Sequence, residues 1–338
     1  MTAMAPKPLL GITLGDPNGV GAEIIVKAYA AGVGEARLVV IGDAGCLERA
    51  CALLGARCRV RRVPTVAAAD DDPTHLDVLD LGNVDPAWQV MGTVQAQAGQ
   101  AAYEALITAA DLALAGEIDA IVTAPLNKEA LHLAGVAEPG HTEILAARAG
   151  ARRVTMMLVA GSFRVTHVST HCALREAIAR VKAARVLEVI ELTDQTLRQM
   201  GIAQPHLAVA GLNPHAGEDG LFGDEEQLEI QPAIDAALAA GIAVAPKPQP
   251  PDTVFHQMQA AGRYDAVVAM YHDQGHIPTK LLAFDEGVNV TLGLPIIRTS
   301  VDHGTAFDIA GQGIANPSSL LQAIHVAAAL ARGKAAKG

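Results

Sequence analysis

The stretch "YDAVVAMYHDQG", residues 264–275, joins an apolar run to a polar cluster. The run "AVVAM" is short and apolar, which is typical of a buried strand. His272, Asp273 and Gly275 follow it almost at once. Side chains that bind metals or move protons thus stand at the end of a predicted strand, in a chain with 12 histidines among 338 residues. That placement indicates either that these side chains bind a metal or move protons, or that His272 is a core histidine with satisfied hydrogen bonds.

The same order of apolar run, polar tip and amphipathic helix recurs along the chain. "PLLGITLGD" (8–16) precedes "GAEIIVKAYAAG" (21–32), and "IDAIVTAP" (118–125) precedes "LNKEALHLAG" (126–135). This pattern predicts βαβ units on a parallel sheet. A length of 338 residues exceeds what one hydrophobic core usually supports, so two domains around a cleft are expected. Residues 70–89 show the least regular pattern and are expected to form a surface excursion.

Composition narrows the class of protein. Hydrophobic residues make up 51% and aromatic residues 3%, as in layered α/β proteins, and the net charge is −11. There is no block of Lys and Arg, so a nucleic-acid partner is not expected, although a few local cations could still bind an anionic small substrate. The beginning "MTAMAPKPLL" has no apolar signal segment, the cysteines form no CxxC, and no run is long enough to span a membrane. We therefore expect a cytoplasmic protein with reduced thiols.

Three predicted strand ends carry a histidine. His171 lies in "STHCALRE", His215 in "GLNPHAGEDGLFG", and His272 in the stretch quoted first. Ligands of open α/β sheets bind beyond the carboxyl ends of the strands. Each histidine alone is more often a core or capping residue, but three together favour a catalytic metal. A shell of histidines suits Zn, Co, Mn or Fe, and a carboxylate such as Asp273 would widen the choice toward Mg.

An anion site is the second candidate. "GHTEIL" (140–145) is expected to open a helix, with Thr142 as its N-cap. A plain cap is one interpretation. The other is that His141 and Thr142 flank a helix N-terminus that binds an anion, and the cations Lys280 and Arg298 further along the chain favour it.

A nucleotide site is the third candidate. No GxGxxG follows the first predicted strand, which disfavours an ordinary Rossmann site. "DHGTAFDIAGQGIANPSSLL" (302–321) is instead rich in glycine and leads into a helix, so a ligand could approach its backbone closely. A simple turn is the alternative for this segment taken alone.

Together these segments resemble the 4-hydroxythreonine-4-phosphate dehydrogenase family of pyridoxine biosynthesis. The similarity runs nearly from end to end, through "GDPNGVGAEI", "TAPLNKEALHLAG", "GHTE", "GLNPHAGEDGLFGDEE", "YDAVVAMYHDQG" and "NVTLGLPIIRTSVDHGTAFDIAG". The last segment also resembles a nucleotide loop of the isocitrate and isopropylmalate dehydrogenases. The resemblance implies their fold, with two α/β/α domains around a central cleft: residues 1–127 plus 300–338 carrying the nucleotide loop, and residues 128–299 carrying most metal and substrate ligands and a dimer interface.

The resemblance also implies roles for particular residues. A divalent metal (Zn, Mg, Co or Mn) would be held by His171, His215 and His272 and shared across a homodimer, with His272 opposite the other two. The phosphorylated substrate would contact His141, Thr142, Lys280, Asn289 and Arg298. NAD, with NADP as the alternative, would lie along residues 302–311, contacting Gly304, Thr305 and Asp308, and reach Asn316.

The implied reaction is oxidation and decarboxylation of a phosphorylated β-hydroxy acid. NAD would take hydride from the carbinol carbon of 4-phosphohydroxy-L-threonine, and the resulting β-keto acid would lose CO2 to give 3-amino-2-oxopropyl phosphate. The metal would assist both steps by stabilising negative charge on the substrate oxygen. Asp252, Asp273 and Lys280 are the candidates for the base that removes the hydroxyl proton.

The chain departs from the biosynthetic pattern around the expected substrate pocket. Cys172, His276 and Pro278, and the segment "PQPPDT" (248–253), resemble a sister group that acts on four-carbon sugar-acid phosphates. The same chemistry on D-threonate or D-erythronate 4-phosphate would give dihydroxyacetone phosphate. Non-catalytic binding of phosphorylated acids, or a metal-dependent phosphatase or acyltransferase, is a more distant alternative, which the segment "DHGTAFDIAG" disfavours.

Overall fold

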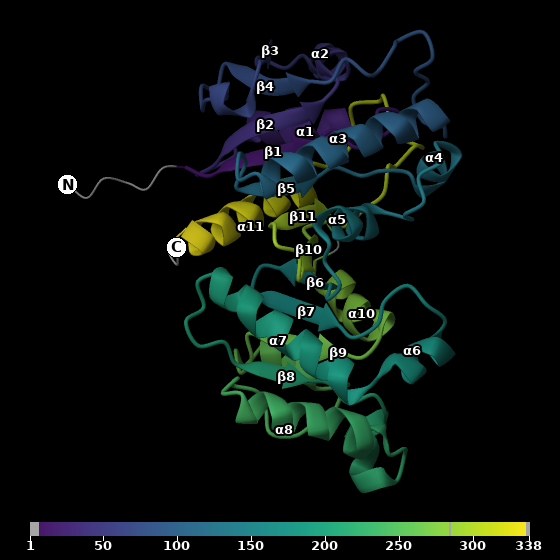
Figure 1. Cartoon of the computed structure of the whole chain (residues 1–338), viewed down its shortest axis with the longest axis vertical. Helices are drawn as coiled ribbons and strands as arrows, with labels where there is room; N and C mark the ends of the chain where they lie inside the picture. Colours follow the sequence, from purple (N-terminus) through teal and green to yellow (C-terminus); the bar gives the residue numbers. More distant parts are fainter. Residues whose placement is uncertain (1–6, 284, 336–338) are drawn as a thin grey trace, which may run out of the picture. The chain divides into compact units, whose positions relative to one another are not determined.

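The computed structural model describes residues 7–283 and 285–335, so part of the N-terminal segment considered above lies outside it. The described chain divides into two compact units (Figure 1). The first contains the residues up to Arg152 and those from Leu294 onward, and the second is Arg153–Gly293.

The first unit is built on a parallel sheet with the strand order β3-β4-β2-β1-β5-β11. Its strands are β1 (Leu9–Thr13), β2 (Arg37–Gly42), β3 (Arg59–Arg62), β4 (His75–Asp80), β5 (Ala120–Thr123) and β11 (Arg298–Val301). Its helices are α1 (Gly21–Ala31), α2 (Ala44–Leu54), α3 (Ala96–Leu114), α4 (Lys128–Leu133), α5 (His141–Ala149) and α11 (Ser318–Ala335), with a 3₁₀ turn at Val66–Ala68.

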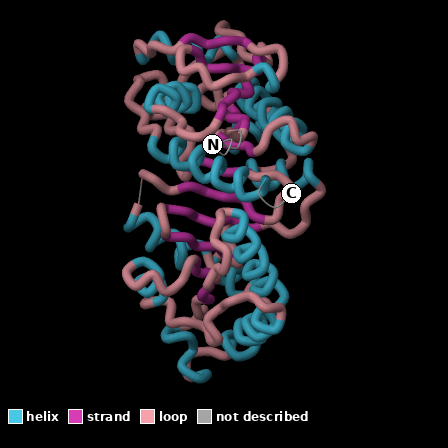
Figure 2. The backbone as a smooth tube through the Cα atoms, turned by 90° about the vertical axis from the view of Figure 1, so that its left-hand side faces the viewer, coloured by secondary structure: helices cyan, strands magenta, loops and turns pink. Residues whose placement is uncertain are grey.

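Helices cover both faces of this sheet (Figure 2). Leu9, Val39 and Ile41 pack into one apolar cluster with Leu106 of α3, and α4 and α5 pack in turn on α3. The helix α11 packs on β1, β5 and β11, and α1 lies beside it and beside α2. Because successive side chains of a strand point to opposite faces, near-continuous apolar strands are what a sheet covered on both sides requires. The α/β class expected from the sequence is confirmed.

The expectation for residues 70–89 was wrong in its middle part. His75–Asp80 form β4, which pairs with β2 and β3 inside the sheet. The strand was not predicted because it contains Asp77, and a buried carboxylate is unusual in a strand. Its two oxygens accept hydrogen bonds from Nε and Nη2 of Arg61, at 2.5 and 2.7 Å, and one also accepts from the backbone of Asp70. Paired in this way, the charge is tolerated in the sheet.

The second unit has a mixed sheet with the order β10-β6-β7-β9-β8. Its strands are β6 (Thr155–Ala160), β7 (Phe163–His167), β8 (Leu207–Val209), β9 (Ala266–Ala269) and β10 (Val288–Leu292). Its helices are α6 (Leu174–Arg180), α7 (Ala183–Gln199), α8 (Gln231–Ala239), α9 (Val254–Gln259) and α10 (His272–Leu282), with a 3₁₀ segment at Pro214–Gly220 and a π-helical turn at Glu226–Ile230.

Only part of this second sheet is parallel. The strands β7, β9 and β8 run parallel, whereas β6 pairs antiparallel with both β7 and β10. A hairpin turn with Gly161 at φ +59° joins β6 to β7, which the prediction of βαβ units alone did not include. Thr166 of β7 accepts a hydrogen bond from Thr193 of α7, while Val165 and His167 face α10. The helices α7 and α10 therefore cover opposite faces.

The units do not end where the sequence placed the domain bounds. Residues 128–152 and 294–299 group with the first unit, because α4 and α5 pack against α3. The assignment of separate functions to two domains stays a prediction. Among the described residues, no helix is both long and apolar enough to cross a membrane.

Gly99 offers a direct test of the packing in the first unit. A Cβ at this position of α3 would lie 2.1 Å from the carbonyl oxygen of Ala130 at α4, so backbone would have to move. Ordinarily Gly→Ala inside a helix stabilises by about 0.5–1 kcal/mol. We expect Gly99→Ala to lower the thermal unfolding midpoint instead. Gly45→Ala on α2 is the control, because its new Cβ meets only side-chain atoms. Equal or higher midpoints for Gly99→Ala would contradict the close packing of α3 on α4.

Candidate active site

Two of the predicted metal ligands lie side by side in the second unit. His171 follows β7 and His272 begins α10 directly after β9, and their ring centroids are 5.6 Å apart. Both line a cavity of about 340 Å³, together with Cys172 and Tyr271. The strand ends thus bring together two residues that lie far apart in the sequence, as expected for neighbouring parallel strands.

His272 is held in one orientation by its neighbours. Its Nδ1 donates a hydrogen bond to the carboxylate of Asp273 at 2.7 Å, which leaves Nε2 as the nitrogen with a lone pair. The ring of His276, one turn further along α10, stacks on His272 with centroids 3.5 Å apart and an interplanar angle of 9°. Nδ1 of His276 donates to the carbonyl of His272 at 3.0 Å. His276, chosen from the sequence only as a departure from the family pattern, is therefore a direct neighbour of the proposed ligand.

His167 was missed by the sequence analysis. It is the last residue of β7, fully buried, and its ring centroid lies 4.8 Å from that of His276. Burial, reinforced by His276 and His272, lowers its pKa to about 3, so the ring is neutral at physiological pH. Gly275 lets α10 approach it: a Cβ there would lie 2.4 Å from Nε2 of His167. The apolar run before His167 made it look like an ordinary strand residue.

His215 lies in a loop with an unusual backbone. Residues 215–219 all have positive φ between 44° and 78°, and only Gly217 among them is a glycine. Left-handed conformations cost roughly 1–2 kcal/mol per non-glycine residue, so the surrounding structure must impose them. The side chain of His215 is 64% exposed and lines a separate cavity of about 410 Å³, beside Lys247 and Pro250.

The donors fit a metal site only in part within one chain. Two imidazoles with Zn–N bonds of about 2.0–2.1 Å place their ring centroids within roughly 6 Å of each other, which suits His171 and His272. Residues 7–283 and 285–335 contain no group of three or more His, Cys, Asp or Glu side chains close enough to hold an ion. His215 is the ligand that the chain does not bring to the other two. Metal binding and its sharing between subunits stay predictions.

The first unit contains a buried cation next to a neutral histidine. Arg298, at the start of β11, is 3% exposed and donates from Nε and Nη2 to the hydroxyl of Thr123 at 3.2 and 2.8 Å. Burial lowers its pKa to about 10, so the guanidinium stays charged. Burial and the positive charges of Arg298 and Lys128 hold the pKa of His141 well below its usual value. His141 is therefore neutral and able to accept or donate a hydrogen bond beside a positive centre.

The remaining predicted substrate residues are distributed over both units. Thr142 is the second residue inside α5 and not its N-cap: Gly140 precedes the helix and provides no side-chain cap. Lys280 lies in the last turn of α10, and Asn289 lies on β10. The side-chain oxygen of Asn289 is buried without a hydrogen-bond partner among the described residues, which suits an acceptor reserved for a ligand. Asp252, a candidate base, is exposed in the turn before α9.

The predicted nucleotide segment packs against the first strand tip of its own unit. The carbonyl of Thr305 accepts a hydrogen bond from Val20, and the backbone of Gly311 donates to Glu23 at 2.6 Å. Gly304, Asp308 and Asn316 are exposed, so a ligand can reach them. Asn316 also accepts bonds from the backbone and hydroxyl of Ser318, where α11 begins. The segment is a fixed loop and not a free turn.

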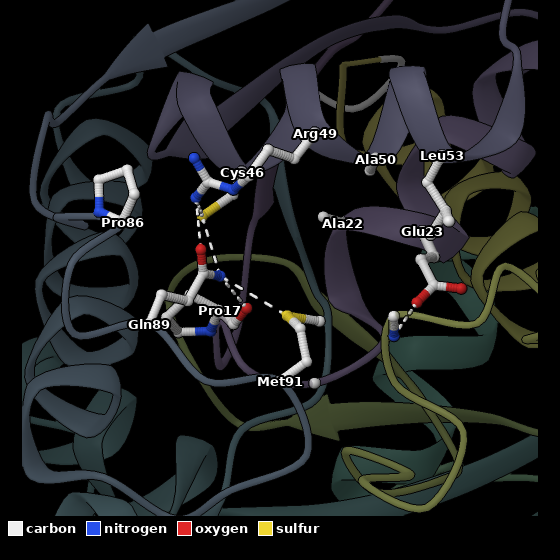
Figure 3. A pocket seen from close by; sticks show the side chains of 12 residues that line it. Pro17, Ala22, Glu23, Cys46, Arg49, Ala50, Leu53, Pro86, Gln89 and Met91 are labelled. Carbon is white, nitrogen blue, oxygen red and sulfur yellow. Dashed lines mark hydrogen bonds between the residues drawn. The ribbon is translucent and has the colours of Figure 1, made fainter.

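A cavity of about 330 Å³ adjoins this loop between α1 and α2 (Figure 3). Gly311 and Gly19 contribute backbone, and Leu53 and Met91 contribute apolar walls. At one end Arg49 donates to Gln89, whose amide donates to the carbonyl of Pro17 at 2.7 Å. The lining also includes the Cys46 thiol, whose pKa burial raises to about 12, so it stays protonated and unreactive. The cavity is suited to binding and not to covalent chemistry.

Asp16 is a second residue that the sequence analysis did not single out. It follows β1, is 1% exposed, and accepts a hydrogen bond from the backbone of Asn18 on one oxygen. The other oxygen has no partner among the described residues. Burial raises the pKa of Asp16 to about 6, which the hydrogen bond only partly offsets. A carboxyl group that titrates near neutrality at a strand end is typical of functional sites. Its position in "GDPNG" was the available signal.

Comparison with known proteins gives concordant results. The chain is 50% identical over 321 residues to the 4-hydroxythreonine-4-phosphate dehydrogenase of Beijerinckia indica, covering 95% of this chain and 94% of that protein. It is 51% identical over 324 residues to the D-threonate 4-phosphate dehydrogenase of Salmonella typhimurium, covering 95% and 98%. A crystal structure of 4-hydroxythreonine-4-phosphate dehydrogenase from Klebsiella pneumoniae superposes with a TM-score of 0.88 at 47% identity, covering 96% and 99%.

The family model described as "Pyridoxal phosphate biosynthetic protein PdxA" matches residues 34–327, which is most of the chain. The relatives named above are dehydrogenases, as the sequence predicted, and their identity extends over nearly the whole length on both sides. The chain belongs to the PdxA family of pyridoxal phosphate biosynthetic proteins.

Proposed function

We propose that the chain catalyses the NAD-dependent and metal-dependent oxidation and decarboxylation of 4-phosphohydroxy-L-threonine, giving 3-amino-2-oxopropyl phosphate and CO2. Membership of the PdxA family makes it a dehydrogenase. The observation that carries the substrate proposal is the buried guanidinium of Arg298 beside the neutral His141. A cation that the protein holds out of water attracts an anionic group strongly, because the local dielectric constant is low.

Substrate binding is proposed for His141, Thr142 and Arg298 of the first unit and Lys280 and Asn289 of the second. The charged guanidinium of Arg298 would pair with an anionic oxygen of the acid phosphate. A neutral His141 adds a hydrogen bond without a second positive charge. Asn289 offers its buried side-chain oxygen to a donor such as a hydroxyl or ammonium group.

Metal binding is proposed for His171, His215 and His272, with Asp273 fixing the tautomer of His272. A bound divalent ion would favour loss of the substrate hydroxyl proton and stabilise the negative charge that develops as CO2 leaves. Asp273 already accepts a hydrogen bond from His272, which supports an orienting role for it. Asp252 and Lys280 stay the other candidates for the base that takes the hydroxyl proton.

Cofactor binding is proposed along residues 302–316, where Gly304, Thr305, Asp308 and Asn316 contact NAD, with NADP as the alternative. The support is the fixed loop against the first strand tip and the neighbouring cavity, whose size matches small-ligand pockets of about 300–1,000 Å³. We propose that this cavity receives part of the nucleotide.

A homodimer in the cytoplasm, with metal ligands shared between subunits, is the proposed assembly. The support lies on α10 itself, which begins with His272 and exposes Ile277, Leu281 and Leu282 by 58%, 81% and 51%. Large apolar side chains on one helix are typical of a surface that another protein covers. A second copy on this helix would lie next to His272 and could bring a missing ligand.

The four-carbon sugar acids D-threonate and D-erythronate 4-phosphate are the second candidate substrates, with dihydroxyacetone phosphate as product. One observation favours them, and the relatives do not decide against them. His276 stacks on His272, so this departure from the biosynthetic pattern lies directly at the proposed metal. A relative named D-threonate 4-phosphate dehydrogenase is also as similar as one named for hydroxythreonine phosphate. The two kinds of candidate substrate undergo the same reaction, and they differ in the group that carbon two carries.

Removal of single metal ligands tests the metal assignment. Groups that only orient a ligand cost about 10- to 100-fold when lost, so loss of a ligand should exceed about 100-fold. We expect His171→Ala, His215→Ala and His272→Ala each to lower NADH formation beyond that value with unchanged circular dichroism. The control is His206→Ala in the same unit, whose ring contacts the carbonyl of Arg263. Near-normal turnover in His215→Ala would remove it from the site.

Subunit mixing tests whether the site is shared. If His215 and His272 bind the same metal from opposite subunits, a heterodimer of His215→Ala and His272→Ala subunits contains one intact site and one with both defects. We expect about half of the wild-type activity per heterodimer. If both histidines serve the same chain, every site keeps one defect. No recovery after exchange confirmed by native mass spectrometry would therefore contradict sharing.

Substrate choice is tested by kcat/KM for the three 4-phosphorylated acids. We expect hydroxythreonine phosphate to be preferred, because a pocket that pairs with its ammonium group rejects a hydroxyl there. Arg298→Ala should reduce kcat/KM for all three acids by about 30-fold or more, since loss of a buried charge pair costs about 2–5 kcal/mol. His276→Leu should change the ratio between them. A clear preference for a sugar-acid phosphate would overturn the substrate and leave the reaction in place.

A further inference from the structure

The three strand ends that carry the proposed metal ligands are tied together by two buried side chains. The hydroxyl of Ser169, after β7, donates to the carbonyl of Met270 at 2.9 Å. The amide of Gln274 on α10 uses both of its ends: Oε1 accepts from the backbone of Met270 at 2.7 Å, and Nε2 donates to the carbonyl of Gly211 at 2.8 Å. Met270 follows β9, and Gly211 begins the loop that carries His215.

These bonds lie in the interior. Gln274 is 8% exposed and Ser169 is 4% exposed, and the backbone groups that they bind end the ladder of β9 with β7 and β8. A buried amide with both ends bonded has one orientation, because reversing it would place like partners together. Gln274 therefore fixes the separation between the start of the His215 loop and the strand end before His272.

A second buried group, Glu226, holds the residues that directly follow Gly211 in the His215 loop. Glu226 is 4% exposed, and its Oε1 accepts from the backbone of Leu212 and of Asn213, each at 2.7 Å. Its Oε2 accepts from the amide of Asn213 at 2.9 Å. A Cβ on Gly217 would lie 2.7 Å from that oxygen, so the left-handed part of the loop packs directly on the carboxylate. Glu226 thus fixes the loop directly after Gly211, and the position of the loop relative to α10 depends on Gln274.

We propose that Gln274 is a positioning residue for the metal site: its amide sets the placement of the His215 loop against the start of α10. The inference rests on the proposed metal ligands. It adds to them a residue that contacts neither metal nor substrate. Replacement should weaken metal binding because the His215 loop and the start of α10 are no longer held in place, and not because a ligand is lost.

The experiment measures metal affinity of the full-length protein by competition with a chelator, using Co²⁺ alone without substrate or NAD. Gln274→Leu removes both bonds at similar volume. Gln274→Glu keeps an acceptor for Met270 and loses the donor to Gly211, so it tests that bond separately. Thr193→Val is the control, because it deletes a fully buried hydroxyl that bonds Thr166 and Val189, away from the strand ends.

We expect Gln274→Leu and Gln274→Glu to bind Co²⁺ about 10- to 100-fold more weakly, as losses of groups that orient metal ligands do. Thr193→Val should lower the thermal midpoint and leave Co²⁺ affinity within about twofold. Should Gln274→Leu fail to fold, Gln274→Glu decides the outcome.

Unchanged affinity in both Gln274 variants, with a lowered midpoint, would show a structural role only and overturn the inference. Equal loss of affinity in Thr193→Val would overturn it as well, because any destabilisation would then suffice. His215→Ala separates the inference from the function beneath it. If that variant loses affinity and the Gln274 variants do not, the metal site stands without the positioning residue. If it binds Co²⁺ normally, the metal assignment fails and the inference with it.

Discussion

The close approach of α10 to β7 is the constraint on which the second unit's site depends. Gly275 allows it, since any larger residue would meet Nε2 of His167 and the side chain of Val165. This approach buries Gln274, places His276 beside His167 and brings His272 beside His171. Because the interior is densely packed, a shift of the helix would displace all of these groups together. A single glycine in "YHDQG" thus explains why helix and polar strand ends form one rigid group.

Much of the fold and of this site could be predicted from the sequence, because the ends of the strands can be recognised in it. Apolar runs followed by polar residues gave the layered α/β class and the neighbourhood of His171 and His272. The predictions failed where a polar group was satisfied by a partner distant in sequence. Asp77 made β4 look like a loop until Arg61 paired with it. The prediction for Thr142 failed for a local reason, because the helix already begins at His141 and Gly140 is its N-cap.

Other features carried no readable signal. His167 lies at the end of an apolar strand, and only tertiary packing shows that its ring is neutral and lies 4.8 Å from the ring of His276. The left-handed run at 215–219 could not be read either, since four of its five residues ordinarily avoid positive φ. Glu226, from a later π-helical turn, holds the backbone of Leu212 and Asn213 before this run and packs against Gly217 within it. Tertiary contacts of this kind are absent from any local sequence pattern.

Both units bury ionisable side chains, but the resulting charges differ between the two units. In the first, Arg298 remains charged although buried, while His141 beside it is kept neutral, so the pair presents one positive charge and one adaptable hydrogen-bonding group. In the second, His167 is buried and kept neutral beside the half-buried rings of His272 and His276, and the carboxylate of Asp273 accepts a hydrogen bond from His272. An anionic substrate suits the first arrangement, and a cation suits the second. The proposed reaction uses both kinds of group: a buried positive charge for the phosphorylated acid, and neutral imidazoles for a divalent ion.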